Sequence, residues 1–171
     1  MRRRGQRWAV GLGAWALAGC GYRPIAPPDG GLSVAGAAPR VARPGVVEAA
    51  LAGSRDELAA QGALSSAPYP RMVVELLRVD ELSEGIRVAA GRPLARGSRV
   101  TVTGRAWVLE SHGGPPRWDT GDMSRAALQA AGPDATSDTR LHDAAAREAG
   151  RQLGRALARR VLGDAEPARA E

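Results

Sequence analysis

Several absences restrict what this sequence can encode. It contains no phenylalanine and no lysine, and its single cysteine, Cys20, stands near the start of the chain. A lone cysteine excludes an intrachain disulfide and the paired thiols of a redox motif. Two of the four tryptophans fall within the first 15 residues, so the core has to be built from valine, leucine and alanine. We therefore expect a small, alanine-lined core with closely packed helices.

Histidine and nucleophilic motifs are also scarce. His112 and His142 show neither HExxH nor HxH spacing and have no second cysteine beside them, so we expect no metal site. No serine lies in a GxSxG motif. Asp119-Thr120-Gly121 matches the triplet of aspartic proteases, but that chemistry needs two such carboxylates together. We interpret the triplet as a polar strand residue before a bend, and we expect neither a cofactor nor enzymatic activity.

The first 19 residues have the order of a bacterial secretory signal. Residues 1–7 carry four arginines, and residues 8–18 form an apolar run that ends in small residues. This run is too short to cross a hydrocarbon core, which needs about 20 residues. The sequence LAGC at 17–20 matches a lipobox, which predicts that Cys20 becomes a lipidated N-terminus. The alternative is a signal peptide that happens to contain a cysteine near its end.

Removal of this signal changes the charge balance. The whole chain has 24 basic and 18 acidic residues, and all the basic residues are arginine. Four arginines leave with residues 1–19, so the mature chain has a net charge of +2. This near balance removes the main support for nucleic-acid binding, and we expect no nucleic-acid partner. The remaining 152 residues are enough for one domain with a single core.

Proline and glycine divide the mature chain into a tether at 20–31, a single domain at 32–163 and a disordered tail at 164–171. The order strand, helix, strands, helix predicts an α+β fold, in which two helices pack on one face of a mainly antiparallel four-stranded sheet. The expected elements are a strand at 32–34, a helix at 44–61, paired strands at 71–79 and 85–90 around a turn at 80–84, strands at 97–111 and 117–128, and a helix at 138–162.

Two of these elements have clear periodicity. The strand at 97–111 alternates with a period of two. Its apolar face carries Val100, Val102, Ala106 and Val108, and its polar face carries Arg99, Thr101, Thr103 and Arg105. The last helix, with Asp138 as its expected cap and Gly163 as its stop, has one apolar stripe. The stripe consists of Leu141, Ala145, Ala149, Leu153, Leu157 and Val161. A GxxxG pattern at 150–154 predicts close packing of this helix on the sheet.

One stretch is unbalanced in charge. Between Gly85 and Leu109 there are five arginines and no acidic residue. Guanidinium groups pair bidentately with phosphate, so the stretch is a candidate contact for an anionic lipid headgroup. The alternative is a solvated strand face and loop. The candidate residues are Arg87, Arg92, Arg96, Arg99 and Arg105.

The chain resembles the lipopolysaccharide-assembly lipoproteins of the LptE type. The likeness rests on the lipobox followed by Cys20-Gly21-Tyr22, on the order of the expected elements, and on a long C-terminal helix containing AAAREA and LARRVL. It covers about residues 20–163 of this chain.

The resemblance implies an outer-membrane lipoprotein, anchored through palmitate-type acyl chains on Cys20, that faces the periplasm. Its implied role is the plug and scaffold of an LptD-type β-barrel that delivers lipopolysaccharide to the outer leaflet, with lipopolysaccharide as the ligand of the arginine stretch. It implies no catalysis. The runner-up is an auxiliary lipoprotein of an ABC-type lipid-transport system, and a third hypothesis is an enzyme with Asp119 as its carboxylate.

Overall fold

The structure, a computed structural model, describes residues 30–38, 40–83, 86–89, 92–95, 97–130 and 134–163. The expected signal, Cys20, most of the tether, Arg96 and the tail at 164–171 lie outside these residues. Seven strands and two helices are described. In chain order they are β1 (Ser33–Gly36), α1 (Pro44–Ala60), β2 (Arg71–Ser83), β3 (Ile86–Ala89), β4 (Arg92–Ala95), β5 (Gly97–Leu109), β6 (Trp118–Asp119), β7 (Met123–Ala130) and α2 (Ala135–Val161).

Five of the strands form one mixed sheet. Its order is β1–β2–β5–β6, and β7 also pairs with β5. The pairs β2–β5, β5–β6 and β5–β7 are antiparallel, but β1 runs parallel to β2. The expected four-stranded, mainly antiparallel sheet is therefore only partly right. The first pair is parallel because α1 crosses between β1 and β2 and returns the chain in the same direction.

Three strand assignments from the sequence are wrong. The expected turn at 80–84 is largely strand, because β2 continues to Ser83 and pairs there with Ser98 of β5. The expected strand at 85–90 does not pair with 71–79, because β3 and β4 pair with each other in a separate hairpin. The expected strand at 117–128 is interrupted between β6 and β7, where Gly121 has a φ of +68°.

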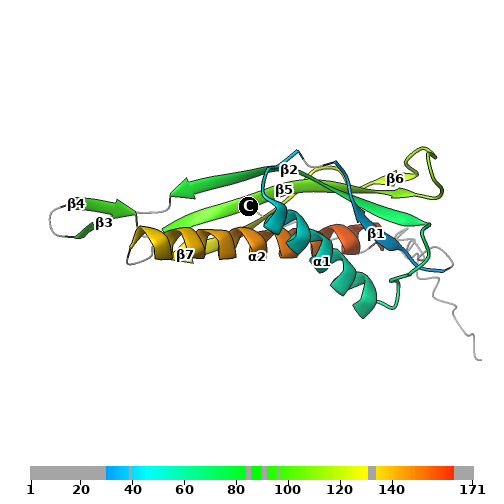
Figure 1. Cartoon of the computed structure of the whole chain (residues 1–171), viewed down its shortest axis with the longest axis horizontal. Coiled ribbons are helices and arrows are strands. Elements are labelled where there is room, and N and C mark those ends of the chain that lie inside the picture. Colours follow the sequence, from blue (N-terminus) through cyan, green and yellow to red (C-terminus); the bar gives the residue numbers. More distant parts are fainter. Residues whose placement is uncertain are drawn as a thin grey trace, which may run out of the picture.

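Both helices lie on the same face of the five-stranded sheet (Figure 1). α1 begins at Pro44, as predicted. The cap of α2 is Asp134 and not Asp138, because Asp134 Oδ1 accepts hydrogen bonds from the amides of Thr136 and Ser137 at 3.0 and 2.9 Å. Gly163, with a φ of +91°, follows the end of α2 as expected. No helix in the described part of the chain is long and apolar enough to span a membrane.

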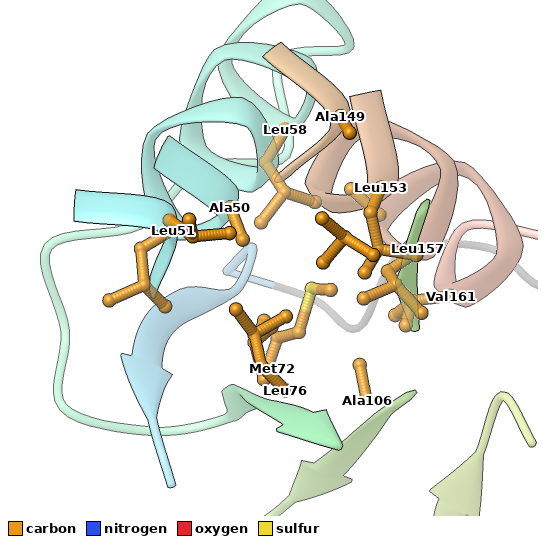
Figure 2. Close-up of a cluster of buried hydrophobic side chains, with 14 of the residues drawn as sticks. Ala50, Leu51, Leu58, Met72, Leu76, Ala106, Ala149, Leu153, Leu157 and Val161 are labelled. Atoms are coloured by element: carbon orange, nitrogen blue, oxygen red, sulfur yellow. The ribbon is translucent and has the colours of Figure 1, made fainter. Parts of the chain in front are cut away.

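The core fills the space between the helices and the sheet (Figure 2). It is built mainly from valine, leucine and alanine, as the composition predicted, with Met72 added. The alternation of β5 is confirmed, since Val100, Val102, Ala106 and Val108 are all buried on the helix side. The stripe of α2 is confirmed except at its start, where Leu141 is 42% exposed.

The two helices approach each other through small residues. A Cβ added at Gly154 would overlap the backbone carbonyl of Ala50, and one added at Gly53 would overlap that of Arg151. Ser54 Oγ lies 3.0 Å from the Ala50 carbonyl oxygen and 3.1 Å from that of Gly154, so its hydroxyl links the two helix backbones. The GxxxG pattern therefore serves close packing on α1, whereas the sequence had predicted packing on the sheet.

Candidate functional site

The candidate residues of β5 lie on the face of the sheet opposite the helices, which we call the open face. Arg99 and Arg105 alternate with the buried residues of β5 and so point away from the helix layer. They are six positions apart in the strand, which corresponds to about 20 Å at about 3.4 Å per residue. Arg87 and Arg92 lie on the β3–β4 hairpin, opposite Leu94 and Ala89. The structure therefore distributes the described candidate arginines over two regions and does not gather them into one site.

Arg105 belongs to a compact ion cluster on the open face. Glu75, on the neighbouring position of β2, is only 6% exposed. Its Oε2 accepts a hydrogen bond from Arg105 Nε at 2.8 Å, and its Oε1 accepts one from Arg40 Nε at 2.6 Å. The Arg105 guanidinium also lies 5.8 Å from the centre of the Trp107 ring, within the range of a cation–π contact. One carboxylate thus orients two guanidinium groups.

The surroundings of Arg105 compensate its charge. The hydrogen bond and the charge of Glu75 raise the pKa of Arg105, and the carboxylates of Asp119 and Asp122 raise it further. A phosphate approaching this arginine would compete with Glu75 and would meet two further acidic groups. Arg105 therefore serves first as part of an internal ion cluster, which weakens it as a lipid contact.

Arg99 has different neighbours. In the ladder it lies directly between Leu82 of β2 and Leu128 of β7, so the three residues form one row across the open face. The two leucines are 66% and 70% exposed, which makes them the most exposed large hydrophobic residues that the structure describes. We call this the Leu82–Arg99–Leu128 row. It stands at the end of the sheet from which the β3–β4 hairpin departs.

Asp119 has a structural role that agrees with its interpretation from the sequence. Its Oδ1 accepts a hydrogen bond from the Gly121 amide at 2.7 Å, which holds the bend between β6 and β7. Thr120 Oγ1 accepts from the Ala106 amide at 2.9 Å and donates to the Gly121 carbonyl oxygen at 2.8 Å. The triplet therefore closes a turn against β5.

His142 and His112 lie in different surroundings. Arg43 donates to His142 Nε2 at 2.8 Å, so the ring hydrogen is on Nδ1, 3.3 Å from Glu81 Oε1. His142 thereby joins the start of α1, the end of β2 and α2. His112 is exposed in the loop after β5. Within the described residues, no group of histidine, cysteine and acidic side chains is arranged to hold a metal ion.

A second ion pair fastens the helices together. Both Glu57 carboxylate oxygens on α1 lie 3.0 Å from guanidinium nitrogens of Arg159 on α2. The hydrogen bond from Arg159 is the main reason that the pKa of Glu57 lies below its ordinary value, and burial only partly opposes it. This bidentate pair links α1 to α2 and includes none of the candidate arginines, so its role is structural.

Sequence reasoning missed Glu75 and the two exposed leucines. Glu75 had a visible signal, because it is the only charged residue within the apolar run MVVELL and such a residue needs a partner. Leu82 and Leu128 had no comparable signal. They become neighbours only through the pairing of β2 and β7 with β5, which depends on residues far apart in the chain.

No protein-family model matches the sequence, and no curated protein matches it. Among solved structures, the chain is similar to a minor lipoprotein from Acinetobacter baumannii, at 13% identity over 78% of this chain and 92% of the other, with a TM-score of 0.49. A protein from Xanthomonas campestris is 15% identical over 84% and 90%, with a TM-score of 0.46. Rare lipoprotein B from Shewanella oneidensis is 14% identical over 76% and 89%, with a TM-score of 0.41. With all these TM-scores below 0.5, the likenesses carry no argument about the function of this chain.

Proposed function

We propose that this chain is a lipid-anchored protein of the outer membrane that acts as plug and scaffold of an LptD-type β-barrel in lipopolysaccharide transport. The observation that carries the proposal is the sequence LAGC at 17–20 continued by Gly21 and Tyr22. An acyl anchor on Cys20 confines the domain to the membrane that holds the barrel. Confinement raises the effective concentration of the domain at its partner.

The shape of the domain supports this role. β2 and β5 have 13 residues each, about 44 Å at about 3.4 Å per residue, and α2 has 27 residues, about 40 Å at about 1.5 Å per residue. The body is only two layers thick, and its long elements run along one axis (Figure 1). A slender, rigid body of this kind suits the lumen of a large barrel, and the largest outer-membrane barrels do contain plugs.

In this proposal the arginine stretch meets the phosphate groups of lipopolysaccharide. Arg105 is already held by Glu75, so a phosphate would have to displace that carboxylate there. The role is one of binding and assembly, and no covalent chemistry is assigned to any residue.

The test is a purification of the tagged protein from detergent-solubilised membranes, with identification of the stoichiometric partner by mass spectrometry. Cys20→Ala removes the anchor, and Tyr22→Ala is the matched control because it leaves the lipobox intact. An outer-membrane barrel recovered one to one with the parent and with Tyr22→Ala, but depleted with Cys20→Ala, is the expected result. An inner-membrane transporter complex would replace the proposal by the ABC-type alternative, and recovery of no barrel would refute it.

A further inference from the structure

His142 lies where three elements of the fold meet. Arg43, the last residue before α1, donates a hydrogen bond from Nη1 to His142 Nε2 at 2.8 Å. On the other side of the ring, His142 Nδ1 lies 3.3 Å from Glu81 Oε1, near the end of β2. The His142 side chain is 14% exposed. One largely buried imidazole thus links the start of α1 and the end of β2 to α2, and we call these contacts the Arg43–His142–Glu81 bridge.

This bridge differs from the other polar links between the two helices. The Ser54 hydroxyl and the Glu57–Arg159 ion pair hold the helices together farther along α1. A hydroxyl does not titrate near neutral pH, and the pKa of Glu57 lies below its ordinary value. An imidazole, in contrast, changes its charge between about pH 5 and pH 8. Mild acid therefore acts on one end of the helix pair and leaves the other links intact.

The first turn of α1 depends on how residue 43 is held. The Arg43 side chain makes no capping hydrogen bond to this turn, and the turn contains no acidic residue. The Val46 and Val47 amides donate to the Arg43 carbonyl oxygen at 3.0 and 3.3 Å. Because the Arg43 side chain is bound by His142, the contact with α2 also positions the carbonyl that these two amides use.

The hydrogen bonds of the bridge require a neutral imidazole. A neutral ring accepts at one nitrogen and donates from the other, whereas an imidazolium donates from both. With a hydrogen on Nε2, His142 can no longer accept from Arg43, and two cations would face each other. The contact with Glu81 responds in the opposite way, because a carboxylate gains an ion pair with an imidazolium. Protonation therefore breaks one half of the bridge and strengthens the other.

The charged groups beyond the bridge do not change this balance. Asp138, one turn earlier in α2, lies with Oδ1 3.2 Å from Gln129 Nε2. Arg125 of β7 lies on the helix side of the sheet and donates to a neighbouring backbone carbonyl oxygen at 2.8 Å. Arg147, more than one turn later in α2, stands beside the start of α1. Two of these three groups are positive, so they do not offset the repulsion between an imidazolium and the arginine at the start of α1.

We infer that the Arg43–His142–Glu81 bridge is a pH-sensitive contact between the helix layer and the sheet. Neutral His142 holds both partners. Protonated His142 keeps Glu81 and releases Arg43, so the first turn of α1 loosens while the rest of the helix pair stays closed. This inference concerns the domain itself and does not depend on a barrel partner.

Nitrogen-15 NMR of the histidine rings in the intact protein tests the neutral form. The chain contains two histidines, and His112, exposed in the loop after β5, provides an internal reference. At about pH 7.5, where an imidazole is mainly neutral, His142 should carry its hydrogen on Nδ1. A hydrogen on Nε2 would overturn the inference, because that tautomer cannot accept from Arg43.

Amide hydrogen exchange, corrected for the intrinsic effect of pH, tests the release. From about pH 7.5 to about pH 5, the protection of the Val46 and Val47 amides should fall about fivefold, which corresponds to the loss of one hydrogen bond. The Gln61 amide donates to the Glu57 carbonyl oxygen at 3.1 Å at the other end of α1, and it should keep its protection. An equal fall at both ends of α1, or none at Val46 and Val47, would refute the proposal.

Three variants assign the effect to the bridge. His142→Gln removes the group that titrates, and Arg43→Gln removes the group that is released, so neither should show the acid-dependent fall. Arg140→Gln is the matched control, because it removes the same charge at an exposed position near the start of α2, and it should behave as the parent does. Protection of the Gln61 amide shows that each variant is folded.

A fall that persists in Arg43→Gln, or that is lost in Arg140→Gln, would contradict the assignment to the bridge. All of these measurements use the protein without a barrel. Failure of the proposed function therefore leaves their results unchanged, and the two proposals are separately testable.

Discussion

Gly154→Ala provides a sharp test of the helix packing, because two effects predict opposite signs. In the middle of a helix, alanine is more favourable than glycine by about 1 kcal/mol. Propensity alone therefore predicts that the substitution stabilises α2. In the structure, however, the new Cβ would overlap the backbone carbonyl oxygen of Ala50 and crowd the Ser54 amide. Backbone atoms cannot rotate away, so relief requires the two helices to separate.

Separation has a cost that the structure allows us to estimate. Overpacking of a well-packed interior costs about 1–3 kcal/mol. Moving the helices apart also weakens the hydrogen bond of Ser54 Oγ across the interface, which contributes about 1 kcal/mol. After subtraction of the propensity gain, we expect Gly154→Ala to lower the free energy of unfolding by about 1–3 kcal/mol.

Urea denaturation of the unlipidated protein, followed by circular dichroism, measures this change. Gly45→Ala is the matched control, since its new Cβ would meet only the flexible Arg147 side chain, with Nε at 3.2 Å. The control should be neutral or slightly stabilised. A Gly154→Ala protein as stable as its parent, or more stable, would refute the close helix contact.

Three further predictions concern ion pairs and capping. Glu75→Gln should lower the free energy of unfolding by about 1–2 kcal/mol in the same denaturation assay, because it weakens two charge-assisted hydrogen bonds of a buried carboxylate. Arg40→Gln should cost less than about 1 kcal/mol, since that side chain is mostly exposed, and an equal cost would contradict the central position of Glu75. The folded-state pKa of Glu57 lies below its ordinary value of 4.5, so its stabilisation is present above that pH and is lost as the pH falls through the folded-state pKa. Stability measured against pH should therefore fall less steeply on acidification in Glu57→Gln than in the parent, and identical curves would exclude this linkage. Asp134→Ala should lower the melting temperature by removing the N-cap of α2, and an unchanged value would return the cap to Asp138, as the sequence had predicted.

The features that could be predicted from the sequence are those fixed by neighbouring residues. Short segments of sequence determine the helix that begins at Pro44 and the alternation of Val100 and Val102 in β5, and both predictions are confirmed. Strand pairing is not local. The segment 80–84 resembles a turn in sequence, yet Asp80 and Leu82 continue β2 and pair with β5. An antiparallel strand tolerates polar residues on the face that the helices do not cover.

The candidate site was predictable to a similar extent. The sequence identified the arginine stretch through its lack of acidic residues, but it could not show that Arg105 is held by Glu75. Glu75 lies 30 residues before Arg105 and reaches it only through the β2–β5 register. The lipid anchor on Cys20 and the role of the arginines stay predictions.

The parallel pairing of β1 has a mechanical consequence. Leu32, directly before β1, is fully buried, with its amide donating to the Ala63 carbonyl at 2.7 Å and its carbonyl accepting from the Ser65 amide at 2.9 Å. β1 then pairs with β2 in register from Ser33 to Gly36. Tension that enters along the strand from a tethered N-terminus loads these hydrogen bonds simultaneously in shear, and does not peel them apart one by one. If the chain is held at its N-terminus, force therefore reaches the sheet through the hydrogen bonds of Leu32 and of the β1–β2 pair acting together.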